Sequence, residues 1–111
     1  MQIWYRVDEL ERARDFYVGL LGFMEVYRDE DGRWLRLSRG GVELHVAEGE
    51  GVGDPEGEAV VTLEVVDVKA EGERLREAGV DVGVVLEIPG TIRLLDVHDP
   101  DGNRVQLSED V

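Results

Sequence analysis

The sequence predicts an α+β fold in which two tandem βαβββ modules form a curved mixed sheet around a central cleft. The order strand, helix and three strands occurs twice, with a period of roughly 60 residues. A single helix covers only one face of a small sheet, so each module needs a second layer, which duplication would supply. We place module 1 at residues 1–48, a linker at 49–58 and module 2 at 59–111, within a single domain.

Module 1 begins with a short strand candidate, QIWYRV (2–7). Residues 8–23 have apolar side chains at helical spacing, which predicts one helix. Asp8 and Glu11 have the spacing of a capping box at its start, and Gly22 stands where a helix commonly ends. The segment MEVYRDEDGRWLRLSRGGVELHVAE (24–48) predicts three strands, joined by turns at DEDG and SRGG.

Module 2 follows a polar, Gly-rich segment (49–58) that is typical of a linker. AVVTLEVV (59–66) predicts a strand, and residues 67–79 predict a helix with Asp67 as N-cap and Gly79 at its end. Three more strands are expected in VDVGVVLEI, TIRLLDVHD and NRVQLSE.

The composition restricts the partners. Asp and Glu number 26 against 12 Lys and Arg, a formal net charge of −14. Nucleic acid binding is disfavoured because phosphate contacts need a basic face, whereas a cationic small ligand would be attracted. No apolar stretch predicts a membrane span and no secretory signal is visible, so we expect a cytoplasmic protein. The chain has no cysteine, which excludes disulfides and thiolate metal sites.

A short pattern occurs in both modules. A glycine-bearing turn leads into a strand in which one polar residue stands between apolar ones: Glu43 in VEL and Gln106 in VQL. Successive side chains of a strand point to opposite faces, so each polar group points away from its apolar neighbours. We interpret Glu43 and Gln106 as equivalent positions that both face the cleft.

The segments DELERARDFYVGLLGF (8–23) and DPDGNRVQLSE (99–109) closely resemble the vicinal oxygen chelate superfamily. This group includes glyoxalase I, extradiol dioxygenases, fosfomycin resistance proteins and bleomycin resistance proteins. The resemblance covers nearly the whole chain and implies the paired-module fold, but one scaffold hosts many chemistries. Metal-using members hold a divalent ion with ligands from the first and last strand of each module.

The resemblance maps three ligand positions onto Gln2, Glu43 and Gln106. The fourth falls at Val61, or at a residue next to it. One carboxylate and two amides make a poor cage for Zn²⁺, Ni²⁺ or Fe²⁺. We therefore expect no cofactor and no iron dioxygenase chemistry. His45 leaves one alternative open, because it shares a strand face with Glu43 and would complete a rearranged site with Gln2.

Without a metal, the predicted cleft still has the residues of a binding site. Gln2, Trp4 and Arg6 share one strand face and would supply a flat wall and a cation. Trp34 shares a face with Arg36, and two tryptophans would sandwich a planar ligand. Core packing of the tryptophans and an ion pair for Arg6 are the alternatives. The predicted ligand-binding residues are Trp4, Arg6, Trp34, Arg36, His45 and Arg93.

These residues favour a small-molecule-binding protein similar to the acidic, metal-free bleomycin resistance proteins, acting by sequestration or sensing. The resemblance and the exposed sheet edges both favour a homodimer. The alternative is a divalent-metal-dependent lyase, isomerase or transferase similar to glyoxalase I, so catalysis stays an open question. A third alternative is a module that binds a protein partner.

Overall fold

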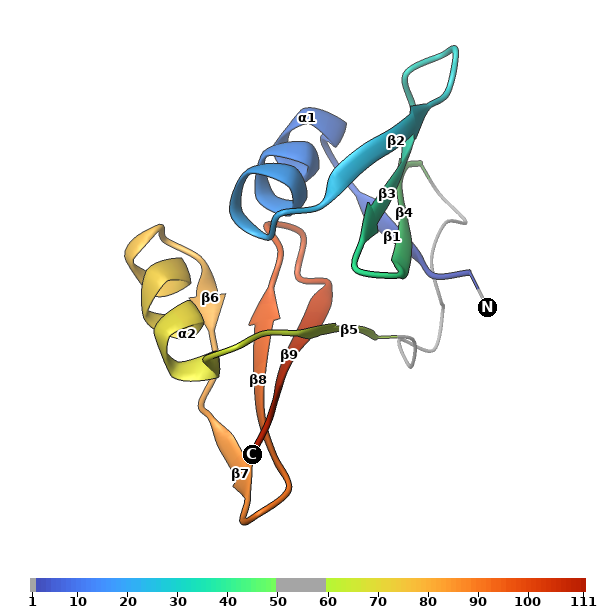
Figure 1. Ribbon diagram of the computed structural model, residues 1–111. Coiled ribbons are helices and arrows are strands. Elements are labelled where there is room, and N and C mark those ends of the chain that lie inside the picture. Colours follow the sequence, from blue (N-terminus) through green and yellow to red (C-terminus); the bar gives the residue numbers. More distant parts are fainter. Residues whose placement is uncertain (1, 50–59) are drawn as a thin grey trace. The chain divides into compact units, whose positions relative to one another are not determined.

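The computed structural model describes residues 2–49 and 60–111, so the predicted linker, apart from Gly49, lies outside the described residues. The chain divides into two compact units, Met1–Val60 and Val61–Val111. In each unit a helical segment covers one face of a sheet (Figure 1). The α+β class and the tandem βαβββ order are therefore confirmed. The cleft shared by the modules stays a prediction.

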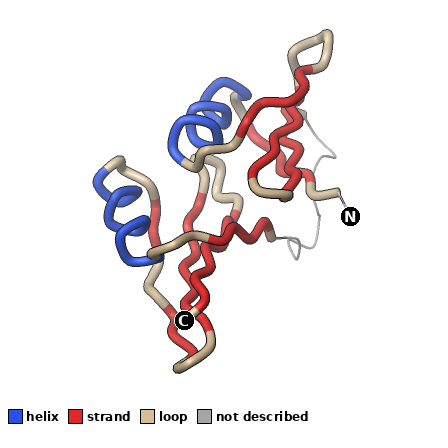
Figure 2. The backbone as a smooth tube through the Cα atoms, viewed as in Figure 1, coloured by secondary structure: helices blue, strands red, loops and turns tan. Residues whose placement is uncertain are grey.

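Unit 1 contains β1 (Trp4–Val7), α1 (Leu10–Arg14), η1 (Asp15–Leu20), β2 (Met24–Arg28), β3 (Trp34–Arg39) and β4 (Val42–Glu48). The strand order in its sheet is β1-β4-β3-β2; β1 runs parallel to β4 and the other pairs are antiparallel. The helical segment lies on one side of the strands (Figure 2). The buried residues of this unit include Tyr5, Val7, Leu10, Ala13, Phe16, Tyr17, Leu35, Leu37, Leu44 and Val46.

Unit 2 repeats this plan with β5 (Val61–Glu64), α2 (Val68–Glu77), β6 (Asp81–Val82), β7 (Leu86–Ile88), β8 (Ile92–His98) and β9 (Arg104–Asp110). The strand order is β5-β9-β8-β6, and β7 also pairs with β8. The buried residues are Val61, Leu63, Val68, Leu75, Leu95, Val97, Val105 and Leu107.

Within residues 2–49 and 60–111, no helix is both long and apolar enough to cross a membrane.

The prediction of one regular helix over residues 8–23 is wrong in detail. The helical segment consists of the short α-helix α1 followed by the π-helical η1, in which the N–H of Leu21 donates to the carbonyl of Phe16 at 3.1 Å. The wider turn buries both Phe16 and Tyr17, whose rings meet edge to face with centroids 4.9 Å apart. Apolar spacing alone does not distinguish the two helix types, because one turn differs by a single residue.

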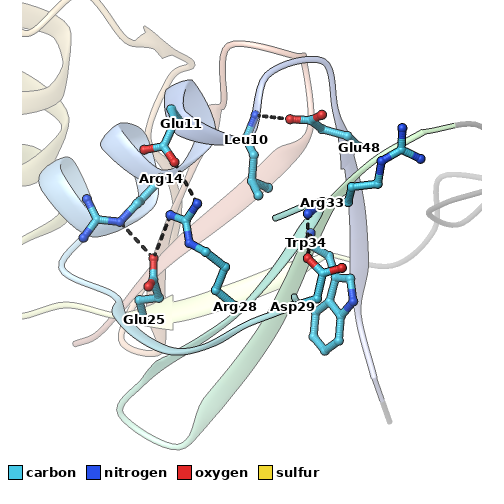
Figure 3. A network of polar contacts seen from close by, with 9 residues as sticks. All are labelled: Leu10, Glu11, Arg14, Glu25, Arg28, Asp29, Arg33, Trp34 and Glu48. Atoms are coloured by element: carbon cyan, nitrogen blue, oxygen red, sulfur yellow. Dashed lines mark hydrogen bonds and ion pairs between the residues drawn. The ribbon is translucent and has the colours of Figure 1, made fainter. Parts of the chain in front are cut away.

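The predicted capping box at Asp8 and Glu11 is also wrong. The N-cap of α1 is Glu9, and its side chain makes no capping hydrogen bond. The N–H of Leu10 donates instead to Oε2 of Glu48, at 2.9 Å, from the far end of β4 (Figure 3). A helix start needs an acceptor for its free N–H groups, and here a residue distant in the sequence supplies it.

In unit 2 the start of α2 has both a local N-cap and a glutamate acceptor from the last strand. Asp67 is the predicted N-cap and accepts from the N–H of Ala70 at 3.0 Å. The N–H of Val68 donates to Oε1 of Glu109 at 2.9 Å. Glu109 of β9 therefore has the role that Glu48 of β4 has in unit 1.

These matching contacts correct the proposed equivalence of Glu43 and Gln106. Glu48 lies three residues after His45, which pairs with Trp4, and Glu109 lies three residues after Gln106, which pairs with Thr62. Gln106 therefore corresponds to His45. The glycine turns misled the comparison because the distance from turn to polar residue differs: Glu43 is two residues after Gly41, whereas Gln106 is four residues after Gly102. Glu43 is two residues before His45, and residues two apart on a strand lie on the same face, so the side-chain faces inferred from the sequence are unchanged.

A β-bulge interrupts the first strand after the helix in both units. In unit 1 the pairing of β2 with β3 shifts between Glu25 and Tyr27, so that Val26 is the extra residue. In unit 2, residues 83–85 lie opposite only residues 95–96 of β8. The strand predicted over residues 80–88 is therefore two strands. A bulge changes which face the following side chains occupy.

Ion pairs fasten β2 to the helix of unit 1 (Figure 3). Glu25 lies 2.9 Å from Nε of Arg14 and 3.4 Å from Nη2 of Arg28, and Arg28 also pairs with Glu11 at 2.9 Å. The hydrogen bond from Arg14 lowers the pKa of the Glu25 carboxyl, against an opposing effect of burial, and Arg28 lowers it further.

Candidate functional site

The sheet of unit 1 has one face turned away from α1 and η1, which we call the open face. Strand alternation puts every second side chain there. The bulge at Val26 adds Tyr27, which pairs with Arg36 instead of continuing on the helix side with Glu25. The open face carries Trp4, Arg6, Tyr27, Trp34, Arg36, Glu43 and His45.

Aromatic rings from all four strands of this sheet meet on the open face. His45 is buried, with 1% of its surface exposed, and the ring of Trp4 stacks on it with centroids 4.3 Å apart and planes at 15°. Trp34 lies 5.4 Å from Trp4 and 5.1 Å from Tyr27, which is 45% exposed. We call Trp4, Tyr27, Trp34 and His45 the aromatic cluster. It places the predicted residues Trp4, Trp34 and His45 together and adds Tyr27, which the alternation argument missed.

The two tryptophans do not form the sandwich that we expected. Their ring centroids are 5.4 Å apart and the planes are inclined by 56°. A guest ring between them would need about 7 Å, twice the ~3.5 Å contact distance of carbon atoms. The aromatic cluster therefore offers a surface for stacking and not a slot.

A polar group borders the aromatic cluster. Nε of Arg36 donates to Nε2 of His45 at 3.3 Å and lies 3.2 Å from Oε1 of Glu43. The same Oε1 is 3.5 Å from Nε2 of His45. Gln2 takes part through its side-chain oxygen, which accepts from the indole N–H of Trp4 at 3.5 Å.

This arrangement does not fit a resident divalent ion. Arginine only donates, so Nε2 of His45 uses its lone pair as the acceptor for Arg36, and Glu43 is already paired with the same guanidinium. An ion held by these two residues would lie against the positive charge of Arg36. Within residues 2–49 and 60–111, no three His, Cys, Asp or Glu side chains are grouped for metal binding.

The two other predicted arginines have ion-pair partners. Arg6 of β1 pairs with Asp8 at 3.0 Å, as the alternative interpretation expects. Arg93 of β8 bonds to Glu87 and, at 3.0 Å, to Glu109, the acceptor at the start of α2. The hydrogen bond from Arg93 lowers the pKa of Glu87. Arg93 therefore contacts the carboxylate that accepts from the N–H of Val68 at the start of α2.

In unit 2, Gln106 of β9 donates from Nε2 to Oδ1 of Asp96 at 3.4 Å. Its neighbour on β5 is Thr62, which is exposed, whereas Val61 is buried with 1% exposure. The first-strand position beside Gln106 is therefore Thr62 and not Val61. A hydroxyl adds one weak neutral oxygen, and the pair still lacks the nitrogen or carboxylate that transition metals prefer.

A cavity of about 330 Å³ lies on the other side of unit 2, where α2 meets the bulged segment 83–85. The residues that line it include Lys69, Gly72, Glu73 and Arg76. None of the sequence-predicted site residues lines it, so it contributes no support to the predicted site.

The family model of the Glyoxalase/Bleomycin resistance protein/Dioxygenase superfamily matches residues 2–107, and the chain belongs to this superfamily. No curated protein gives a significant match.

Three solved structures illustrate the proteins to which this chain is similar in fold. TnmS3, an antibiotic binding protein from Streptomyces sp. CB03234, is 28% identical with a TM-score of 0.72, covering 100% of this chain and 96% of that chain. Lactoylglutathione lyase from Agrobacterium tumefaciens is 19% identical with a TM-score of 0.77, covering 98% and 91%. The fosfomycin resistance protein FosX from Listeria monocytogenes is 17% identical with a TM-score of 0.80, covering 100% and 92%. The last two show the fold alone.

Proposed function

We propose that this protein binds a small organic molecule with a planar ring system on the open face of unit 1, and acts by sequestration or sensing. The aromatic cluster carries the proposal, because it extends from the buried His45 to the exposed Tyr27. Aromatic side chains with a few convergent polar groups are typical of ligand sites. The likeness to an antibiotic binding protein supports the same function.

The experiment uses the chain's own fluorescence. Both tryptophans of the sequence belong to the aromatic cluster, so emission reports on this site. A panel of planar compounds is titrated, and the melting temperature is measured in parallel. We expect saturable quenching with a rise in melting temperature. A panel in which no compound changes either signal would overturn the proposal.

Two variants localise the binding. Tyr27→Ala removes the most exposed ring of the aromatic cluster and should weaken affinity about threefold or more, since an aromatic pair is worth roughly 0.5–1.5 kcal/mol. Leu86→Ala, at a 59% exposed residue of β7 in unit 2, is the matched control and should leave affinity unchanged. Equal losses in both variants would contradict the location.

The second candidate is a divalent-metal-dependent lyase, isomerase or transferase. The 3.5 Å approach of Glu43 to His45 is the observation that favours it, and Arg36 would have to leave both residues first. Stoichiometric uptake of Zn²⁺, Ni²⁺, Mn²⁺ or Fe²⁺ that raises the melting temperature, and that Glu43→Ala abolishes, would support it over sequestration. A cationic ligand, a homodimer and a cytoplasmic location stay predictions.

A further inference from the structure

Arg36 lies beside both the polar group and the outer rings of the aromatic cluster. It lies on β3 directly opposite His45 of β4. Its Nε is fixed by the contacts to His45, at 3.3 Å, and to Glu43, at 3.2 Å. Its guanidinium carbon is 5.8 Å from the ring centroid of Tyr27 and 5.9 Å from that of Trp34. The side chain is therefore held in place beside the stacking surface.

The outer edge of this guanidinium is available. Both polar contacts of Arg36 are made by Nε, and within residues 2–49 and 60–111 the structure gives no partner for Nη1 or Nη2. The side chain is 42% exposed. Arginine has five N–H donors in a planar fork that matches the two oxygens of a carboxylate. Four of these donors belong to Nη1 and Nη2, which the contacts to His45 and Glu43 leave unused.

The local charges differ from those of the whole chain. A net charge of −14 favours cations at long range. At the open face, however, the charge of Glu43 is balanced by Arg36, and Nε2 of His45 accepts from the same guanidinium. A cation stacked on Tyr27 and Trp34 would lie next to Nη1 and Nη2 of Arg36, which have no anionic partner within residues 2–49 and 60–111.

We infer that Arg36 selects a planar aromatic ligand that bears a carboxylate, which its Nη1 and Nη2 bind while the ring stacks on Tyr27 and Trp34. This inference rests on the proposed function and assigns the ligand class of that site. Arg36 is a specificity-determining residue, and Glu43 and His45 are positioning residues that act through its Nε. A guanidinium held at Nε loses less freedom when its fork is filled.

The test uses three probes of one shape: 2-naphthoate, 2-naphthylmethanol and 2-naphthylmethylammonium. Affinities are measured by calorimetry at pH 7, and the two indole N–H signals are followed by NMR. We expect 2-naphthoate to bind about tenfold or more tightly than the ammonium probe, with the alcohol between them, because a charge-assisted hydrogen bond is worth about 1.5–3 kcal/mol.

Variants assign the preference to Arg36. Arg36→Gln should abolish the preference for 2-naphthoate, whereas Arg36→Lys should retain part of it, because lysine keeps the charge and loses the fork. Arg39→Gln is the matched control: it removes the same charge from the same strand, on the opposite face. It should leave the preference intact. Far-UV circular dichroism checks that each variant is folded.

The outcomes separate the two claims. Equal binding of the three probes, or tighter binding of the ammonium, overturns the role of Arg36 and leaves the proposed function standing. A preference that persists in Arg36→Gln overturns it as well. Failure of all three probes to bind or to shift either indole signal overturns the proposed function together with this inference.

Discussion

Trp34 is the centre of the aromatic cluster, and its removal tests how the open face is packed. Its ring lies 5.1 Å from Tyr27, 5.4 Å from Trp4 and 6.0 Å from His45. The two nearest pairs are worth roughly 0.5–1.5 kcal/mol each beyond their burial. A fully buried Trp→Ala change costs about 3–5 kcal/mol. Trp34 is only half-buried, so we expect Trp34→Ala to lower the free energy of unfolding by about 2 kcal/mol.

Urea denaturation followed by far-UV circular dichroism measures this loss, because the substitution removes one of the two fluorophores. Trp34→Phe keeps an aromatic ring and should cost less than about 1 kcal/mol. Val66→Ala, at a 96% exposed apolar residue, is the control and should stay within about 0.5 kcal/mol of the native chain. The remaining emission from Trp4 should shift to the red as its neighbour is lost. A cost no larger than that of the control, with unchanged Trp4 emission, would refute the packing described for this face.

Three further changes test contacts that hold the helices of the two units in place. The pKa of Glu25 is lowered in the folded state, so its carboxylate stabilises the fold above pH 4.5, and this stabilisation is lost as the pH falls through the lowered pKa. Glu25→Gln should therefore reduce the free energy of unfolding at pH 7 by up to about 1 kcal/mol. Its melting temperature should also fall less steeply at acid pH than that of the native chain; an equally steep fall would contradict the role of the Glu25 carboxylate. Glu48→Ala leaves the N–H of Leu10 without its acceptor and should cost about 1 kcal/mol in urea denaturation, as loss of a helix cap does. Gly72→Ala would bring a Cβ to 2.8 Å from Leu95; overpacking of about 1–3 kcal/mol should outweigh the gain of about 1 kcal/mol in helix propensity, and a rise in melting temperature would show that Leu95 yields at little cost.

Local sequence patterns predicted most of the fold and the faces of the strands. The helix over residues 67–79 has the predicted cap at Asp67 and ends before Gly79, whose φ is +87°. Alternation correctly placed Trp34 with Arg36 and Glu43 with His45 on one face. These features depend on a few neighbouring residues, so they are readable from the chain itself.

Two of the misses share one cause, which is that the deciding partner lies far away in the sequence. The acceptor of Leu10 comes from Glu48, 38 residues further along the chain. Tyr27 joins the open face because a bulge forms at Val26 against β3. No pattern within MEVYR signals that bulge, so a sequence-based search for the site could not include Tyr27.

The sequence by itself determined the doubled βαβββ plan and which side chains of β3 and β4 share a face. Only the tertiary structure decided which open-face residues meet. The parallel register of β1 on β4 stacks Trp4 on His45, and the register of β3 on β4 brings Arg36 to both His45 and Glu43. Side-chain alternation has a period of two and is encoded locally, whereas the register between distant strands is set by core packing and bulges, which no short segment specifies.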